Sequence, residues 1–249
     1  MNTNFDITTD LFLGGKLKIQ QYKKGFKSGS DAVLLASFIP SLSGNILEVG
    51  CGVGVASLCL VRRLSDIHIT GIDIDETLIQ LATRNAKDNG LDARCTFLTQ
   101  DITKDIRDKG LPPQTFDHVF SNPPYFDGSS PSPVPERAVA RSHTIPLREW
   151  VAYCIKMVKP RGRLSFIYPT TSLHSLLGAL EGVGDIRLLP LWPSADKPSK
   201  RILVSARKGV KGGLTLEQGL VLHGLTGVYT REAQQILKEG EGLADLFPS

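Results

Sequence analysis

Apolar residues recur along this chain in two alternating patterns from residue 45 onward. Short runs rich in β-branched residues predict strands, and longer runs with apolar residues three and four apart predict helices. The predicted strands are 45–49, 67–73, 95–98, 116–121, 163–168, 186–191 and 202–206. The predicted helices are 55–64, 76–89, 147–158 and 172–180. Strands that alternate with helices are typical of an α/β fold, a parallel sheet with helices on both faces.

The last two predicted strands break this alternation. No helix separates 186–191 from 202–206, because Pro193 to Lys200 is a loop rich in Pro, Ser and Lys. A short loop joins antiparallel strands, whereas parallel neighbours need a longer crossover. We therefore expect a seven-stranded, mostly parallel sheet with an antiparallel hairpin at one edge.

The N-terminal segment differs from this core. It contains an extended run at 17–20 and, before the apolar run 32–39, the segment Gly25-Phe26-Lys27-Ser28-Gly29-Ser30-Asp31. Ser28 and Asp31 have the spacing of a capping box, which predicts that a short helix begins here.

The C-terminal tail adds a predicted strand at 216–222 and an amphipathic helix at 229–238. Both can dock on the sheet. We expect one domain over 1–249, with an N-terminal cover (1–44), a core (45–210) and a C-terminal strand and helix (211–249).

Charge is distributed unevenly along the chain. The 249 residues are 41% hydrophobic and 22% charged, with a net charge of +4, which is ordinary for a globular protein. Residues 45–128 carry eight Lys and Arg against twelve Asp and Glu, whereas residues 136–163 carry seven against two and residues 187–211 seven against one. Grouped basic segments favour a nucleic-acid surface, and simple solvation is the alternative for any single side chain.

The chain lacks a long apolar segment and a metal-binding spacing of cysteines. No segment approaches the roughly 18 apolar residues of a membrane span, and the first residues lack the order of a signal peptide. A cytoplasmic location without membrane contact is expected. The cysteines, Cys51, Cys59, Cys95 and Cys154, lack the spacing of a zinc site, so we expect free thiols and no metal.

Three glycines stand at alternate positions in Glu48-Val49-Gly50-Cys51-Gly52-Val53-Gly54, between a predicted strand and a predicted helix. Glycine there lets the backbone turn tightly and lets a ligand approach closely. A dinucleotide site that began at Gly50 and Gly52 would have its third glycine at position 55, which is Val55. Glu48 also suits a cationic or hydrogen-bond-donating ligand better than a pyrophosphate.

The loop resembles the first motif of the Rossmann-like S-adenosylmethionine-dependent methyltransferases, which reads acidic-x-Gly-x-Gly-x-Gly. In that family an acidic residue that ends the second strand binds the ribose hydroxyls, and another after the third strand flanks the adenine. Asp73 and Asp101 hold these positions here, and a carboxylate can accept from two vicinal hydroxyls. The resemblance implies S-adenosylmethionine as cofactor and S-adenosylhomocysteine as product. The cofactor-binding residues that it implies are Lys27, Gly29, Asp31, Glu48, Gly50, Cys51, Gly52, Gly54, Asp73, Ile74, Asp101, Ile102 and Asn122.

The tetrapeptide Asn122-Pro123-Pro124-Tyr125 follows the fourth core strand, at the sheet edge where ligands bind in open α/β folds. Consecutive prolines supply carbonyls without N–H groups. The Asn122 side chain and the Pro123 carbonyl can accept the two hydrogens of an exocyclic amine or amide, and so aim its lone pair at a methyl group. Tyr125 can stack on a flat base. The string resembles the motif of amino-methyltransferases that act on adenine, cytosine or glutamine amides.

The two flanks narrow the resemblance. The segment 25–35 and the tail 220–233 are similar to the bacterial tRNA (adenine-N6)-methyltransferase family, which modifies the adenine beside the anticodon of a valine tRNA. In the tail, Leu225-Thr226 stands where that family usually has a Pro-Asp type turn. By this resemblance Lys27 to Asp31 cover the cofactor and 122–125 hold a flipped adenine of a tRNA partner. Basic residues that could then follow phosphates are Arg137, Arg141, Arg161, Arg163, Lys197, Lys200, Arg201, Arg207 and Lys208.

Other functions remain open at this point. A glutamine N-methyltransferase acting on release factors shares Asn-Pro-Pro-Tyr, but carries a helical recognition domain where residues 1–44 here offer one short helix. Another RNA or DNA amino-methyltransferase is a further alternative. The intact Asn122 speaks against an inactive binding protein with this fold, and the missing third glycine against a nicotinamide enzyme. The oligomeric state is left open between a monomer and a weak dimer.

Overall fold

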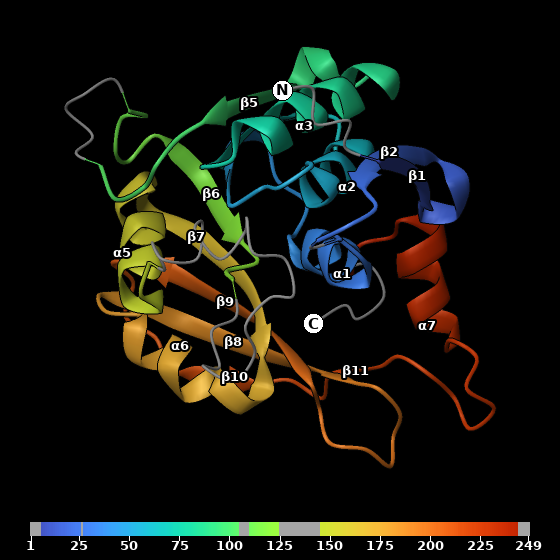
Figure 1. Cartoon of the computed structure of the whole chain (residues 1–249). Helices are drawn as coiled ribbons and strands as arrows, with labels where there is room; N and C mark the ends of the chain where they lie inside the picture. The colour runs from blue at the N-terminus through green and yellow to red at the C-terminus, as the bar shows by residue number, and fades with distance from the viewer. Residues whose placement is uncertain (1–5, 26, 105–109, 125–144, 244–249) are drawn as a thin grey trace.

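A nine-stranded sheet forms the centre of the protein, in a computed structural model that describes residues 6–25, 27–104, 110–124 and 145–243. Its strand order is β10-β8-β9-β7-β6-β3-β4-β5, with β11 also paired to β8. Figure 1 shows the sheet running through the whole molecule. The strands are β3 (Gly44–Val49), β4 (Ile67–Asp73), β5 (Cys95–Thr99), β6 (Phe116–Ser121), β7 (Val158–Pro169), β8 (Val183–Trp192), β9 (Arg201–Lys208), β10 (Leu214–Leu216) and β11 (Leu220–Val221).

All seven predicted core strands are present, and the predicted antiparallel pair is confirmed as β8 and β9. The single tail strand predicted at 216–222 is wrong, because this segment holds only the end of β10 and the two residues of β11. β9 lies between β7 and β8 and runs against both, whereas the other neighbours in the sheet are parallel. The short strands β10 and β11 pair with the outer side of β8 and extend the sheet beyond seven strands. The sequence gives little warning of β10, because Leu214 and Leu216 are exposed.

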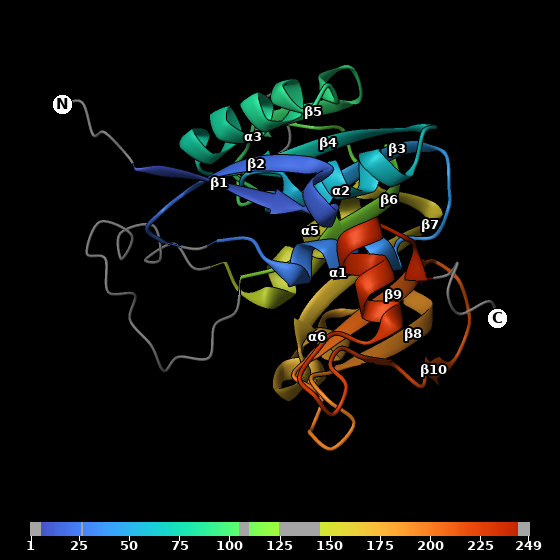
Figure 2. The same cartoon turned by 90° about the vertical axis from the view of Figure 1, so that its right-hand side faces the viewer.

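Helices cover both faces of the sheet (Figures 1 and 2). On one face lie α1 (Ser30–Phe38), α2 (Val55–Arg63) and α3 (Glu76–Asp88), and on the other α5 (Leu147–Met157) and α6 (Leu173–Ala179). Successive residues of a strand point to opposite faces. Accordingly Ile46 of β3 belongs to the apolar cluster under α1 and α2, while Leu47 and Val49 belong to the cluster under α5.

The N-terminal segment forms a hairpin of β1 (Ile7–Phe12) and β2 (Leu17–Tyr22) around the turn η1 (Leu13–Gly15). The sequence predicts only residues 17–20 of β2. It does not predict β1, because the residues of β1 alternate between exposed and half-buried and leave no apolar pattern. Asn85 of α3 accepts a hydrogen bond from the Gln20 N–H at 2.8 Å and donates to the Gln20 carbonyl at 3.1 Å. An amide side chain of the core thus holds the hairpin in the way that a neighbouring strand would.

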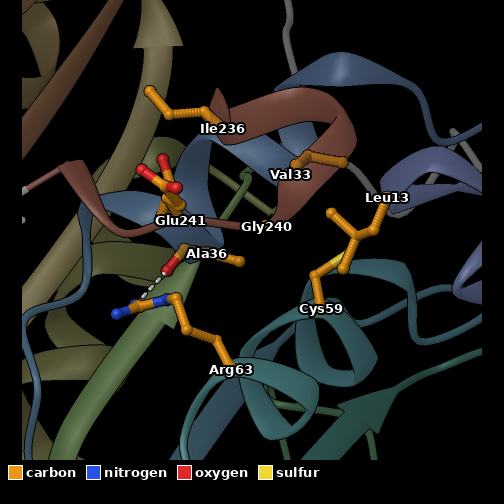
Figure 3. A pocket seen from close by; sticks show the side chains of 9 residues that line it. Leu13, Val33, Ala36, Cys59, Arg63, Ile236, Gly240 and Glu241 are labelled. Carbon is orange, nitrogen blue, oxygen red and sulfur yellow. Dashed lines mark hydrogen bonds between the residues drawn. The ribbon is translucent and has the colours of Figure 1, made fainter. Parts of the chain in front are cut away.

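The C-terminal helix begins at α7 (Arg231–Gln234) and continues as the π-helical turn η4 (Gln235–Glu239). Thr230 caps it, because its hydroxyl accepts from the Ala233 N–H at 3.2 Å. A small cavity of about 10 Å³ separates this helix from α1 and α2 (Figure 3). Arg63 closes its lower side and donates to the carbonyls of Ala36, at 2.8 Å, and Ile39. The cavity belongs to the packing of the helices, since its lining comes from α1, α2 and the C-terminal helix and its end, with Leu13 of the hairpin turn.

The start of α1 differs from the predicted capping box. Gly29 is the N-cap residue, and no side chain caps the helix. The backbone N–H and carbonyl of Ser28 instead bond to the side chain of Gln21, at 2.9 and 3.2 Å. Asp31 pairs with Arg201. The helix is therefore correctly predicted, but tertiary contacts and not a local box fix its first turn.

Candidate active site

The carboxyl ends of β3 and β6 meet where the strand order reverses. From β3 the chain continues outward through β4 and β5 and then returns to β6 on the other side of β3. Such a switch point is where open α/β sheets bind ligands. The Ser121 hydroxyl at the end of β6 donates to the Val49 carbonyl at the end of β3, at 2.6 Å. Gly50 and Asn122, which follow these residues, therefore start from neighbouring points.

The glycine loop adopts a backbone that glycine alone accepts easily. Gly50, Gly52 and Gly54 have φ angles of 75°, 53° and 84°, in the region that strains residues with a Cβ. The N–H groups of Gly50 and Cys51 both donate to the Ile72 carbonyl, at 2.8 and 3.0 Å. The loop is thereby fixed to the end of β4.

The surroundings of the three glycines separate packing from ligand space. A Cβ on Gly50 would lie 2.8 Å from the Trp150 ring, and one on Gly54 would lie 2.9 Å from Phe97. A Cβ on Gly52 would meet nothing within 4 Å. Gly50 and Gly54 are thus needed for internal packing, whereas Gly52 presents bare backbone to an open side of the loop.

Asp73 ends β4 directly beside the glycine loop. Its carboxylate accepts from the Gly52 N–H at 2.9 Å and from the Asp75 N–H at 3.0 Å. Burial raises its pKa, and the two backbone hydrogen bonds oppose that shift. Each oxygen keeps a second lone pair, so the carboxylate retains the capacity to accept from a pair of hydroxyls.

Glu48 lies under the loop and not on its ligand side. It is 3% exposed and accepts from the N–H of Ser57 at 3.0 Å and from the Ser57 hydroxyl. Burial raises its pKa to about 8. In this position the carboxyl group ties β3 to the first turn of α2, and the cofactor contact of Glu48 stays a prediction.

Of the residues predicted on the adenine side, Ile74 is exposed beside the loop, whereas Asp101 and Ile102 bond to or pack against the protein. Ile74 is 58% exposed beside Asp73, as an apolar wall for a flat ring would be. Asp101 accepts from the N–H and hydroxyl of Thr103, at 3.0 and 2.6 Å. Ile102 packs against the apolar cluster under α5, so its side chain supports the loop from below. Cys51 is buried as well, with its pKa raised by burial.

The predicted cover residues are placed by ion pairs. Lys27 lies 3.4 Å from Asp10 of β1, and Asp31 lies 2.9 Å from Arg201 of β9. Gly29, between them, has open space where a Cβ would stand. The segment therefore bridges the N-terminal hairpin and the far side of the sheet.

The structure describes Asn122, Pro123 and Pro124 of the predicted catalytic motif, while Tyr125 lies outside the described residues. Asn122 is half-buried, Pro123 is buried and Pro124 is exposed. They leave β6 at the same edge as the glycine loop. The motif and the loop are thus brought together, as the sequence predicts.

Two residues that sequence reasoning missed connect these parts. The Trp150 indole N–H donates to the Ser121 hydroxyl at 2.9 Å, and the same ring lies against Gly50. Trp150 of α5, Ser121 and Val49 form one chain of hydrogen bonds across the switch point. The only signal in the sequence is the position of Ser121 directly before Asn122.

The basic residues proposed for phosphate contact divide between opposite ends of the sheet. In the register of β7 and β9, Arg163 stands opposite Arg207 and Pro169 stands opposite Arg201. These two positions are six residues apart along the strands, which is about 20 Å at 3.3 Å per residue. Arg161, Arg163, Arg207 and Lys208 thus lie at the end opposite Asn122. Lys197, Lys200 and Arg201 lie at the same end as Asn122. Arg137 and Arg141 are outside the described residues.

Two further properties concern the described part of the chain. Within 6–25, 27–104, 110–124 and 145–243, His, Cys, Asp and Glu form no group of three that could hold a metal ion. Over the same ranges, no helix is long and apolar enough to span a membrane. Cys51, Cys59, Cys95 and Cys154 are free thiols.

Two solved structures that share this fold are described as O-methyltransferases. A predicted O-methyltransferase from Agrobacterium tumefaciens matches 85% of this chain and 97% of its own, with a TM-score of 0.73 and 24% identity. An S-adenosylmethionine-dependent O-methyltransferase from Thermotoga maritima matches 76% of this chain and 68% of its own, with a TM-score of 0.54 and 17% identity. At these identities the likeness establishes the fold.

A family model described as "Methyltransferase domain" matches residues 41–181. The protein is therefore a Rossmann-like methyltransferase with S-adenosylmethionine as its cofactor, and the open backbone at Gly52 beside the Asp73 carboxylate fits that group. Relatives named tRNA1(Val) (adenine(37)-N6)-methyltransferase are 30% identical in Vibrio parahaemolyticus, over 84% of this chain and 86% of the relative, and 29% identical in Porphyromonas gingivalis, over 90% and 92%. The chain belongs to this tRNA1(Val) (adenine(37)-N6)-methyltransferase family.

Proposed function

We propose that the protein transfers a methyl group from S-adenosylmethionine to the N6 amine of an adenine in the anticodon loop of a valine tRNA. The observation that carries the proposal is the Ser121–Val49 hydrogen bond, 2.6 Å long, which holds the start of Asn122-Pro123-Pro124 against the start of the glycine loop. The names of the relatives supply the substrate. A tRNA substrate also implies a cytoplasmic location.

In this proposal the cofactor supplies an electrophilic methyl group, and the chain positions the amine. The Asn122 side-chain oxygen and the Pro123 carbonyl accept the two amine hydrogens, so that the nitrogen lone pair points away from them. Gly50, Gly52 and Asp73 bind the cofactor, and Tyr125 stacks on the base. An anticodon-loop base is already partly unpaired, so it is easily extruded into the site.

The remaining site residues take supporting roles in the proposal. Ile74, Asp101 and Ile102 form the adenine side, with Ile102 as a packing residue. Lys27, Gly29 and Asp31 cover the cofactor, and the cover, core and tail act as one domain. Glu48, Cys51 and Gly54 shape the loop from beneath.

Methyl transfer from labelled S-adenosylmethionine tests the proposal. Purified protein should label unmodified total tRNA at adenine 37 of valine tRNA and leave release factor unlabelled. Asn122→Ala should lower the rate by about 100-fold or more, with cofactor affinity unchanged. Asn45→Ala is the matched control, because Asn45 is exposed at the opposite end of β3. Label confined to release factor, or full activity of Asn122→Ala, would contradict the proposal.

A further inference from the structure

The residues assigned to the cofactor occupy one half of the catalytic edge. Apart from the cover at 27–31 and Asn122 itself, they follow β3, β4 and β5, whereas on the other side of Asn122 the sheet continues through β7, β9 and β8. These three strands span about 14 Å, at 4.7–4.9 Å each. A nucleic acid that approaches Asn122 from this side passes over the ends of β7, β9 and β8.

Two loops lie at that end of β8 and are joined to each other. The loop 193–200 connects β8 to β9, and the loop 222–230 connects β11 to α7; we call the pair the two-loop surface (Figure 1). The backbone N–H of His223 donates to the Pro193 carbonyl at 3.0 Å, and His223 Nδ1 lies 3.0 Å from the same oxygen. The loops therefore form one preorganised unit.

The two-loop surface presents an aromatic ring. Tyr229 is 36% exposed and stacks on His223, with 4.6 Å between ring centroids and 25° between ring planes. Tyr229 also lines a hollow of about 470 Å³, together with Leu11 and with Gly29 of the cofactor cover. A tyrosine that is supported by a second ring and borders a hollow is suited to stack on a nucleobase, since every base has a flat face.

The charge of the surface agrees with a polyanion. Lys197 and Lys200 are exposed, and in the described part of the chain neither forms a salt bridge. Two of the basic residues at the opposite end of the sheet are engaged internally: Arg163 binds Asp185 and Ser205, and the Lys208 ammonium donates to the Val158 carbonyl. Lys197 and Lys200 therefore offer two exposed cations at the same edge as Asn122.

We infer that the two-loop surface binds the nucleotides that flank the target adenine, with one base stacked on Tyr229 and phosphates against Lys197 and Lys200. The inference rests on the proposed tRNA substrate and names the part of the chain that holds it. The exposed Leu225 and Val228 would equally suit a protein partner, but the stacked rings and the two exposed lysines, which outnumber the one carboxylate of their loop, Asp196, favour RNA.

Binding of a labelled, unmodified valine tRNA transcript to the full chain tests the inference. The variant K197Q/K200Q should weaken binding about tenfold and reduce the salt dependence of the binding constant by about two phosphate contacts. The matched control is K156Q/K211Q, which removes two exposed lysines at the opposite end of the sheet. The control should bind with the affinity of the wild-type protein.

The ring is tested separately. Tyr229→Ala should weaken binding about tenfold, whereas Tyr229→Phe, which keeps the ring, should bind normally. Cofactor affinity and melting temperature should be the same in all four variants, which separates a lost contact from a lost fold. Equal losses in both lysine pairs, or normal binding by K197Q/K200Q and Tyr229→Ala, would overturn the inference.

The wild-type protein distinguishes the two proposals. If it methylates the transcript while K197Q/K200Q and Tyr229→Ala bind normally, only the two-loop surface is wrong. If it fails to methylate any tRNA, the proposed function fails and the inference fails with it. If the same variants instead lose binding to a protein substrate, the surface serves a protein partner and the RNA assignment is overturned.

Discussion

Arg201, the first residue of β9, donates a hydrogen bond from Nε to the Asp31 carboxylate of α1 at 2.9 Å, across 170 residues of sequence. Both side chains are about one third exposed, so the pair contributes on the order of 1 kcal/mol or less to stability. Its effect is positional. It holds the first turn of α1, and with it the cover at 27–29, over the catalytic edge.

The pair predicts a coupled effect on cofactor binding. Asp31→Asn and Arg201→Gln should each weaken S-adenosylmethionine binding several-fold, because either change releases the cover. In a double-mutant cycle measured by calorimetry, the double variant should bind S-adenosylmethionine no more weakly than either single variant. If Asp31 touched the cofactor independently of Arg201, the two losses would add.

The hydroxyl of Ser121 predicts a second effect, on turnover. Ser121→Ala removes the acceptor of the Trp150 N–H and the donor to the Val49 carbonyl, which should lower the free energy of unfolding by about 1–3 kcal/mol. It should also lower kcat about tenfold or more, because a small displacement of reacting groups is costly.

Ser165→Ala is the control for this prediction. Ser165 is equally buried and lies on β7. Its hydroxyl is hydrogen-bonded to His118 Nε2 over 3.1 Å and does not contact the site. Its removal should cost similar stability in denaturant titrations but leave kcat unchanged. An equal fall of kcat in both variants would mean that general destabilisation explains the result.

Substitution of Gly52 should lower both stability and cofactor affinity, whereas substitution of a similar glycine elsewhere should lower stability alone. Its φ of 53° makes Gly52→Ala cost about 1–2 kcal/mol of backbone strain, and the new methyl group enters the open side of the loop. Gly90→Ala carries similar strain, at φ 67° and also in open space, but lies after α3 at the other end of the sheet. Both variants should melt earlier, and only Gly52→Ala should bind S-adenosylmethionine more weakly.

Glu48 predicts a pH dependence of stability. Burial raises its pKa in the folded protein to about 8, from 4.5 in the exposed state. The folded state therefore binds a proton that the unfolded state has released, and the free energy of unfolding falls as the pH rises between these values, on the order of a few kcal/mol. Glu48→Gln should remove this fall in denaturant titrations from pH 5 to 8, whereas the exposed Glu76→Gln should retain it. A wild-type profile as flat as that of Glu48→Gln would show that the carboxyl group ionises freely.

The parts of the fold that local patterns determine could be predicted from the sequence. Buried apolar runs such as those of β3 and β6 fixed the core strands, and the glycine spacing fixed the loop after β3. The edge elements β1 and β10 escaped prediction, because their side chains are exposed or half-buried and leave no hydrophobic signal.

The contacts that arrange the site depend on tertiary structure and could not be predicted. The sequence predicts that Glu48 contacts the cofactor. It does not predict that Glu48 is buried against Ser57 of α2, whose N–H donates to its carboxyl group. The basic residues of β7 and β9 are close in sequence to those that follow β8. Only the antiparallel pairing of β7 with β9 places Arg163 and Lys200 at opposite ends of the sheet.

The reversed direction of β9 has an evolutionary consequence. Because β9 runs against its neighbours, the chain leaves β8 and enters β9 at the same edge, and a short loop suffices where a parallel strand would need a crossover. That loop can change in length and charge without disturbing the loops after β3, β4 and β5. On the inference that this loop contacts the methyl acceptor, changes confined to it alter acceptor binding while the methyl-donor residues after β3, β4 and β5 stay the same.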